Sequence, residues 1–468
     1  MKNTIMHRQI AVYVIVVLVM QSCVTSKYST PEVELTETFR TAEVAVSDDT
    51  ASIAQQSWRE IFTDPLLIGY IETALEKNND MRFAFKQIEI AELYYFQGKA
   101  QFYPTLSAEA GHTYQKSSEN TAMGSFNSSG QNITAITGYL SWEADIWGKL
   151  RSNKRALEAG VLQSQANRQA MQTRLVAGVA SMYYDLLTID EQIKITKETI
   201  EAREESLEVI KVLKQSGRSN ELAVKQTEAQ VLAAKSILVD LKNQIRTLEN
   251  SMSVLLGVMP QNIKRSSFDE QEIDIDLKVG TPLSLLRNRP DVRAAEYALQ
   301  NAFELTNVAK AQLYPSLTIT ASGGLQSNDI SNLIDAGSLF TSIFGGLAQP
   351  IFNGKRLRTQ HEVSMVQQEQ TKINFEQAIL LGCREVSDAL FAYEASQENI
   401  QLKKEAFEVN TLSVEYAEEL LNYGYANYLE VLTAQQNALN AGLTLAVEKN
   451  NRLQALVNLY QALGGGAQ

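Results

Sequence analysis

The clearest pattern in the sequence is a seven-residue apolar repeat in the segment from Gly148 to Gly217. Val179, Leu186 and Ile193 follow one another at intervals of seven, and the segment contains no proline. This spacing predicts one continuous helix, or two stacked helices, on the order of 100 Å long. A seven-residue seam of that length requires partner helices that pack as in a coiled coil. The same pattern recurs from Gly354 to Gly424.

Other helices are predicted on either side of the first long one. Asp64 followed by Pro65 is a typical helix start, and the apolar period after it predicts a single helix as far as about Tyr103. The long helix breaks at residues 217–220, and a second helix is predicted from Glu221 to Leu256. We expect these two helices to form an antiparallel pair.

The apolar period changes to two after each Tyr-Pro pair. Residues of about 105–116 and 134–147 alternate between a mostly apolar and a polar face, and residues of about 316–326 repeat the pattern. A fourth strand is predicted at about 339–352, where Gly345, Gly346 and Pro350 make the alternation irregular. Strands of about ten residues with this alternation fit a sheet that crosses a bilayer. They also fit a half-solvated hairpin in an ordinary sandwich, and the alternation alone leaves both interpretations open.

The two halves of the chain carry the same motifs in the same order. The helix breaks at Gly217 and Gly424 are about 207 residues apart. The ends of the two halves are separated by the same number of residues. This indicates an internal duplication, in which each repeat contains a helix, two strands, a long helix and a final helix. The fold class is therefore α+β. The predicted segments are a first repeat at 58–257, a connector at 258–288 and a second repeat at 289–468.

The N-terminus carries an export signal. Residues 1–22 have a basic start and an apolar core and end in Gln21-Ser22, and Cys23 follows directly. A small residue before cysteine is typical of a lipoprotein signal, in which Cys23 becomes the lipidated first residue and contacts membrane lipid. The alternative is ordinary signal cleavage beside an incidental cysteine. Residues 23–57 are polar and acidic, and we expect an extended linker.

Composition excludes several classes of function. The formal net charge of −12 argues against binding of nucleic acid. The three histidines are scattered, and only Cys383 remains after Cys23, so the sequence indicates neither a metal site nor a disulfide. We find no nucleophile–base pair and no phosphate loop. The sequence therefore predicts no catalytic residues, no cofactor and no enzyme.

Four strands in each chain cannot close a sheet on itself. If the strands lie in a membrane, their edges must be paired, because lipid cannot satisfy free backbone groups. Three chains would together supply 12 strands, a number that can close into a barrel. The helices would continue this 12-stranded barrel as a long helical coiled-coil barrel.

Several motifs together resemble the outer-membrane factor (TolC-like) family of channel-tunnels, and within it the lipoprotein branch paired with resistance-nodulation-division pumps. The resemblance extends from about Cys23 to the last residue. Its motifs are Trp58…Phe62-Thr-Asp64-Pro65-Leu, Ala74-Leu75…Asn78-Asn79-Asp80, both Tyr-Pro-x-Leu strand starts, Arg289-Pro290-Asp291-Val292, Pro350-Ile-Phe352-Asn-Gly354 and Leu459-Tyr460-Gln461-Ala462-Leu463-Gly464-Gly465-Gly466.

The resemblance implies a function and a set of partners. The expected protein is a homotrimer in the outer membrane of a Gram-negative bacterium, lipid-anchored and extending into the periplasm. It would be the exit duct of a tripartite efflux system, working with a periplasmic adaptor (membrane-fusion) protein and an inner-membrane pump. An exit duct for protein secretion is an alternative. A lipid-anchored trimeric coiled-coil surface protein is a second alternative, but it does not explain two hairpins at matched positions.

Two sites follow from the resemblance alone. The first comprises the helix tips that would contact the adaptor. Its residues are Gly217, Arg218, Ser219, Asn220, Gly424, Tyr425, Ala426 and Asn427. The alternative is that these residues form plain turns with no contact role. The second is the periplasmic aperture, where Leu429 would form an apolar ring. The family's usual aspartate and arginine correspond to Thr433 and Gln436 here, and Glu430 is the only acidic residue nearby.

We therefore expect a mouth held shut by Leu429 and neutral hydrogen bonds, without a salt-bridged latch. Simple seam packing of Leu429 is the alternative. On the polar face of the strands, Glu109, Glu143 and Asp145 would give the channel an acidic interior that favours cations.

Overall fold

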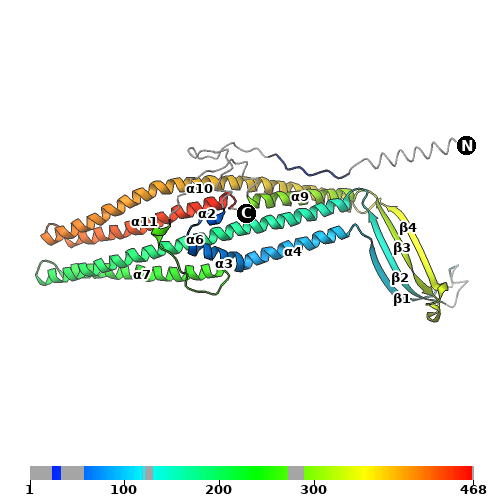
Figure 1. Cartoon of the computed structure of the whole chain (residues 1–468), viewed down its shortest axis with the longest axis horizontal. Coiled ribbons are helices and arrows are strands. Elements are labelled where there is room, and N and C mark those ends of the chain that lie inside the picture. Colours follow the sequence, from blue (N-terminus) through cyan, green and yellow to red (C-terminus); the bar gives the residue numbers. More distant parts are fainter. Residues whose placement is uncertain (1–23, 33–56, 119, 122–129, 272–288, 466–468) are drawn as a thin grey trace. The chain divides into compact units, whose positions relative to one another are not determined.

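A computed structural model describes residues 24–32, 57–118, 120–121, 130–271 and 289–465 (Figure 1). Cys23, the predicted signal at 1–22, most of the linker and residues 272–288 of the connector lie outside the described residues. The chain divides into two compact units that alternate along the sequence. Among the described residues, the first unit contains 24–32, 88–164 and 295–375, and the second contains 57–87, 165–294 and 376–465 with the gaps stated above.

The first unit contains a single antiparallel sheet with the strands in the order β1-β2-β3-β4. These strands are β1 (Thr105–Gln115), β2 (Gln131–Ala144), β3 (Ser316–Ser327) and β4 (Leu339–Ala348). Three short 3-10 helices are also described in the chain: η2 (Phe268–Glu270), η3 (Ile330–Asn332) and η4 (Ala336–Ser338).

The register places apolar residues from each of the four strands on one face. Leu106 pairs with Leu140, Leu140 with Ala321, and Ala321 with Ile343. Directly opposed residues share a face of a sheet, so this row crosses the whole sheet. The period-two interpretation of the strands is confirmed.

Two strand ends differ from the prediction. β2 ends at Ala144, because the Asp145 side chain accepts hydrogen bonds from the backbone N–H groups of Leu150 (2.9 Å) and Arg151 (3.0 Å) and turns the chain into the next helix. β4 ends at Ala348, two residues before Pro350, which has no N–H to donate to a ladder.

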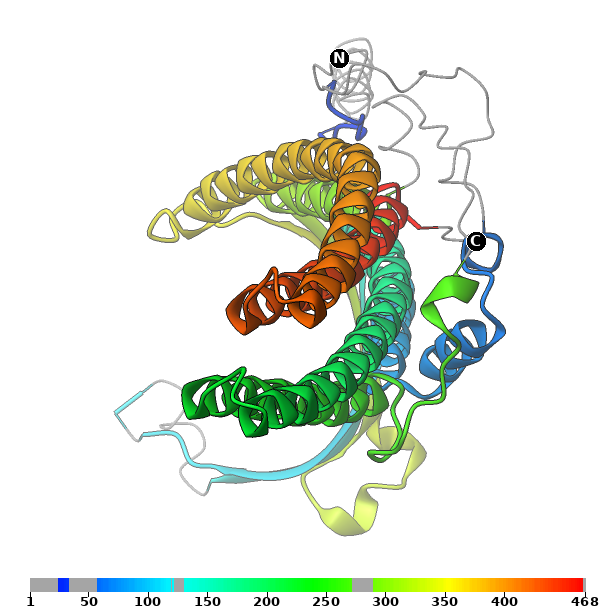
Figure 2. The same cartoon turned by 90° about the vertical axis from the view of Figure 1, so that its left-hand side faces the viewer.

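The long helices are continuous, as the seven-residue repeat predicts. The first hairpin is α6 (Lys149–Gln215) with α7 (Glu221–Leu255), and the second is α10 (Arg356–Tyr423) with α11 (Tyr428–Ala462). Figures 1 and 2 show α7 beside α6 and α11 beside α10. None of the described helices is both long enough and apolar enough to span a membrane.

The helix predicted from Pro65 to Tyr103 is two helices, so that prediction is wrong. The helices before β1 are α2 (Trp58–Ile61), α3 (Pro65–Lys77) and α4 (Asn79–Ala100), and α9 (Pro290–Ala311) precedes β3. Asn78 interrupts the chain because its carboxamide donates to the Leu255 carbonyl (2.8 Å) and accepts from the N–H groups of Asp80 (2.8 Å) and Met81 (3.0 Å). A buried side chain thus caps the start of α4.

The main hydrophobic core lies in the second unit. It joins α2 and α3 to the middle of α6 and the end of α11, and Phe62, Leu67, Tyr183, Leu186 and Tyr460 are almost fully buried in it. Phe62 and Tyr460 meet edge to face with ring centroids 5.6 Å apart. The end of the chain is therefore packed against its first helices.

Candidate functional site at the helix tips

The two predicted tips are tight turns of the same kind. Gly217 and Gly424 have φ of +76° and +82°, a conformation that glycine adopts without strain. The residue after each glycine closes the turn: the N–H groups of Arg218 and Tyr425 donate to the carbonyls of Leu213 and Leu420, both at 2.8 Å. The sequence pattern therefore located both chain reversals correctly.

An asparagine begins the returning helix at each tip. The Asn220 side chain accepts from the N–H of Ala223 (3.0 Å). The Asn427 side chain accepts from the N–H groups of Leu429 (2.9 Å) and Glu430 (3.2 Å), and Glu430 Oε2 accepts from the N–H of Asn427 (3.0 Å) in return. This reciprocal pair is a capping box, so Glu430 serves the turn.

The structure brings the two tips together. The Tyr428 hydroxyl donates to Gln226 Oε1 (2.6 Å), and a Cβ atom placed on Gly424 would lie 3.6 Å from Arg218 Nη2. A small apolar cluster around Ile210 and Val224 packs against Tyr428. The adjacent turn leaves Tyr425 largely outside, with 84% of its surface exposed. All eight predicted tip residues therefore lie at one end of the two hairpins.

A cavity of about 180 Å³ lies next to this apolar cluster. Residues from all four helices line it, among them Ser206 on α6, Thr227 on α7, Glu418 on α10 and Leu432 on α11. Gln435 crosses between these helices, because its amide nitrogen donates to Ser206 Oγ (2.9 Å) and Glu418 Oε1 (3.0 Å). The hairpins are thus held together by polar contacts beside incomplete packing.

The four predicted aperture residues have different environments in the single chain. Leu429 is 54% exposed, whereas Thr433 turns back to its own helix and donates to the Leu429 carbonyl (2.8 Å). Gln436 Oε1 accepts from Arg203 Nη2 (2.9 Å), and its amide nitrogen donates to Asn440 (3.0 Å). Seam packing within the chain therefore does not account for Leu429.

Arg203 is the residue that the sequence interpretation missed. Its side chain is 1% exposed, and it donates from Nη1 to the Gln230 carbonyl (2.8 Å) and from Nη2 to Gln436. Its Nε has no partner, and burial lowers the pKa of its guanidinium. Buried charges are normally paired with an opposite charge, so a guanidinium held only by neutral groups is unusual.

The sequence did contain a signal for Arg203. The apolar row that includes Met182 and Ile189 continues in steps of seven to Thr196 and Arg203, and both of these are buried. A charge on a row that faces the partner helices indicates a buried polar contact. The contact joins α6, α7 and α11 and includes Gln436, one of the predicted aperture residues.

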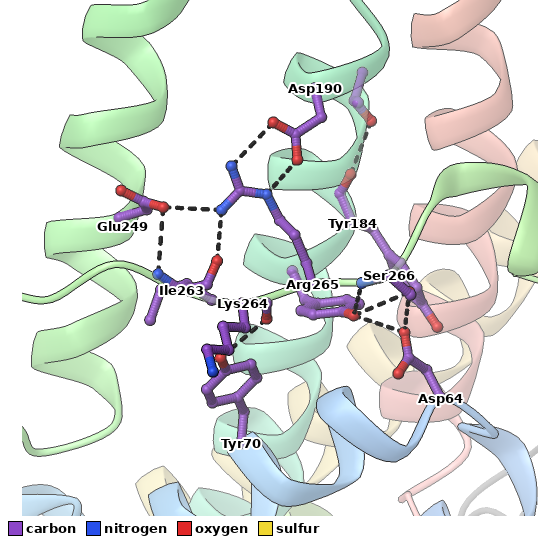
Figure 3. Close-up of polar contacts among 11 residues, drawn as sticks. Asp64, Tyr70, Tyr184, Asp190, Glu249, Ile263, Lys264, Arg265 and Ser266 are labelled. Atoms are coloured by element: carbon purple, nitrogen blue, oxygen red, sulfur yellow. Dashed lines mark hydrogen bonds and ion pairs between the residues drawn. The ribbon is translucent and has the colours of Figure 1, made fainter.

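A second polar cluster attaches the connector to α3, α6 and α7 (Figure 3). Asp64 Oδ2 accepts from the hydroxyl groups of Tyr183 (2.6 Å) and Ser266 (2.5 Å). Arg265 pairs with Asp190 and, at 2.9 Å, with Glu249. This part of the connector is therefore fastened to the helices by charge-assisted hydrogen bonds.

The acidic residues predicted to line the strands are mostly neutralised. Glu143 Oε1 lies 2.6 Å from Lys149 Nζ, and Asp145 Oδ2 lies 3.0 Å from Arg151 Nε. Only Glu109, which is exposed on β1, stands without such a partner among these three. The predicted acidic interior is therefore wrong for Glu143 and Asp145, whose carboxylates hold the first turn of α6. Across the described residues, no group of three or more His, Cys, Asp or Glu side chains could hold a metal ion.

Comparison with known proteins gives consistent matches along the chain. The family model of outer membrane efflux proteins matches residues 70–258 and 282–465. The probable efflux pump outer membrane protein TtgC of Pseudomonas putida is 29% identical over 94% of this chain and 91% of its own length. The probable outer membrane lipoprotein SilC of Salmonella typhimurium is 26% identical over 96% and 97%. A solved structure of CusC, described as forming a transmembrane channel, superposes with a TM-score of 0.83 at 26% identity and covers 94% of this chain and 99% of CusC.

Proposed function

Because this chain belongs to the outer membrane efflux protein family, we propose that it is the passive exit duct of an efflux system, assembled from three copies of the chain. The observation that carries the proposal is the four-stranded sheet, whose outer strands have unpaired edges. β1 and β4 each pair on one side only. Lipid cannot satisfy free backbone groups, so neighbouring copies would have to pair these edges.

We further propose that the tips contact a periplasmic adaptor, which connects the duct to an inner-membrane pump of the resistance-nodulation-division class. Tyr425 supports this role because its side chain is largely exposed at the turn. Adaptor binding would act by favouring an open arrangement of the hairpins over a closed one. Leu429 would narrow the aperture, and Thr433 and Gln436 would leave it without a charged latch.

Lipidation of Cys23 remains part of the proposal. The segment that follows it is fastened to the first unit, because the backbone of Ser26 exchanges two hydrogen bonds with the Asn307 carboxamide (3.2 and 3.1 Å). Thr25 lies against Gly148, at the point where the chain leaves β2 and enters α6. Acyl chains on Cys23 would therefore start close to the end of the sheet.

A susceptibility panel on a deletion strain tests the function. Antibiotics, organic solvents, dyes and metal salts would be compared with and without complementation by wild type, Tyr425→Ala or Met259→Ala. Met259 is a matched control, since it is 85% exposed but lies after α7, away from the tips. We expect wild type and Met259→Ala to restore resistance, and Tyr425→Ala to restore it poorly at the same protein level. Failure of the wild type and of both variants to restore resistance would contradict an efflux role.

A further inference from the structure

The turn between β4 and α10 combines exposed apolar side chains with unpaired cations. Ile351 is 100% exposed and Phe352 is 89% exposed. Lys355, Arg356 and Arg358 are also exposed, and none of the three makes an ion pair with any residue that the structure describes. We call these five residues the β4–α10 patch. Three neighbouring cations without counter-charges are notable in a chain with a net charge of −12.

The corresponding turn of the first repeat has neutralised its cations. Between β2 and α6, Lys149 lies 2.6 Å from Glu143 and Arg151 lies 3.0 Å from Asp145. These ion pairs stay within the chain, so that turn offers little net charge to a ligand.

The second repeat has Lys355 where Lys149 stands and Leu357 where Arg151 stands, with Arg356 and Arg358 on either side of Leu357, but it lacks both carboxylates. Aligning the turns on Gly148 and Gly354 places Gln349 where Glu143 stands and Ile351 where Asp145 stands. The substitutions remove two negative charges and add an exposed apolar side chain beside the cations. This change turns an internal ion-pair cluster into an open cationic and apolar surface.

Lys355 adds an independent observation. Its φ of 66° makes it the only residue other than glycine with a positive φ in the described part of the chain. Glycine would adopt this conformation without strain, whereas a lysine is disfavoured there. The chain therefore carries a cation at a position where backbone stability alone would favour glycine.

The patch continues the apolar face of the sheet. Leu347 pairs with Leu317 at the end of β4 and is 67% exposed, and the patch begins four residues later. Apolar side chains next to lysine and arginine are typical of segments at a membrane surface, where cations meet lipid phosphate and apolar groups enter the acyl boundary. The geometry points to a binding site for the phosphate of an anionic phospholipid headgroup at this surface of the outer membrane.

Lipid titration of the purified full-length protein tests this site. Binding of short-chain phosphatidylglycerol would be compared with that of phosphatidylcholine by native mass spectrometry. The test variant is Lys355→Gln, Arg356→Gln, Arg358→Gln. We expect it to bind phosphatidylglycerol on the order of 100-fold more weakly, since each cation near a lipid surface contributes about fivefold. Equal binding by wild type and this variant would overturn the proposal.

A control variant removes three positive charges at another place in the chain. Lys242, Arg246 and Lys403 are exposed and have no ion pairs among the described residues, so Lys242→Gln, Arg246→Gln, Lys403→Gln should bind like wild type. Loss of binding in this control as well would show a general charge effect and would also overturn the site.

A single substitution keeps the test valid if the triple variant misfolds. Lys355→Gly suits the backbone conformation and removes one cation, so we expect about fivefold weaker binding of phosphatidylglycerol. Wild-type affinity in Lys355→Gly, or a preference of the wild type for phosphatidylcholine, would refute the site. Resistance in the deletion strain should be unchanged by Lys355→Gly, so failure here is separate from failure of the efflux role.

Discussion

At the scale of single residues, neutral hydrogen bonds hold one buried charge, Arg203, between the two hairpins. Gln436 on α11 accepts a hydrogen bond from the guanidinium of Arg203 on α6. The sequence itself shows that Thr433 and Gln436 are neutral. It did not reveal the partner, because Arg203 and Gln436 are more than 200 residues apart and single-sequence periodicity carries no pairing information.

Replacing Gln436 by leucine should destabilise the hairpins. Arg203 would keep one neutral partner, and an unsatisfied buried donor costs about 1–3 kcal/mol, more when it is charged. We expect a lower thermal unfolding midpoint for Gln436→Leu and a raised one for Gln436→Glu, which supplies a carboxylate. Gln401→Leu is the control, because Gln401 is exposed and its amide nitrogen donates to Glu405 on the same helix. Equal midpoints for Gln436→Leu and Gln401→Leu would contradict this account of Arg203.

At the scale of elements, the sequence predicted regular segments well and tertiary interruptions poorly. The long helices, the strands and both glycine turns follow from period and turn chemistry. The break at Asn78 was missed because it depends on a hydrogen bond to the Leu255 carbonyl, which is distant in sequence. The packing of residues 263–271 onto the helices was missed for the same reason. A polar segment without periodicity is predicted to be a linker, because its sequence does not show its distant partners.

The contacts between Asp64 and the connector make the stability of the folded chain depend on pH in the acid range. Burial by itself would raise the pKa of Asp64, but hydrogen bonds from Ser266, Tyr183 and Gln271 outweigh it and hold that pKa below its ordinary value. A lowered pKa in the folded state stabilises the fold above the unfolded value of about 3.9, and the contribution is lost as the pH falls below it.

We therefore expect the unfolding midpoint of the wild type to fall steeply below about pH 4. Asp64→Asn should unfold more easily at pH 7 and show a shallower acid dependence, as followed by circular dichroism. An identical pH profile for the two proteins would remove Asp64 from this role.

At the scale of the whole molecule, the single chain leaves large apolar surfaces uncovered. On α10, Val366, Leu380 and Phe391 are each more than 60% exposed, and on α4 the same holds for Phe83 and Leu93. Surfaces of this kind on helices mark contacts with other chains. They support the proposed homotrimer independently of the unpaired sheet edges.

Phe391→Asp should weaken assembly. Burial of a phenylalanine contributes about 1.5–3 kcal/mol for each copy, and an unpaired aspartate in the same interface would add a desolvation cost. Light scattering of the detergent-solubilised protein should show three chains for wild type and for the control Met259→Asp, but smaller species for Phe391→Asp. A stable trimer of Phe391→Asp would place this surface outside the subunit contact.

Single-channel recording in planar bilayers tests the central claim most directly. Wild type should conduct with low open probability, and Leu429→Ala should open more often with larger conductance, because the side chain that we propose narrows the aperture is shortened. Val447→Ala, an exposed apolar change elsewhere on α11, should behave like wild type. Absence of conductance from both wild type and Leu429→Ala would contradict the account of this chain as an efflux duct.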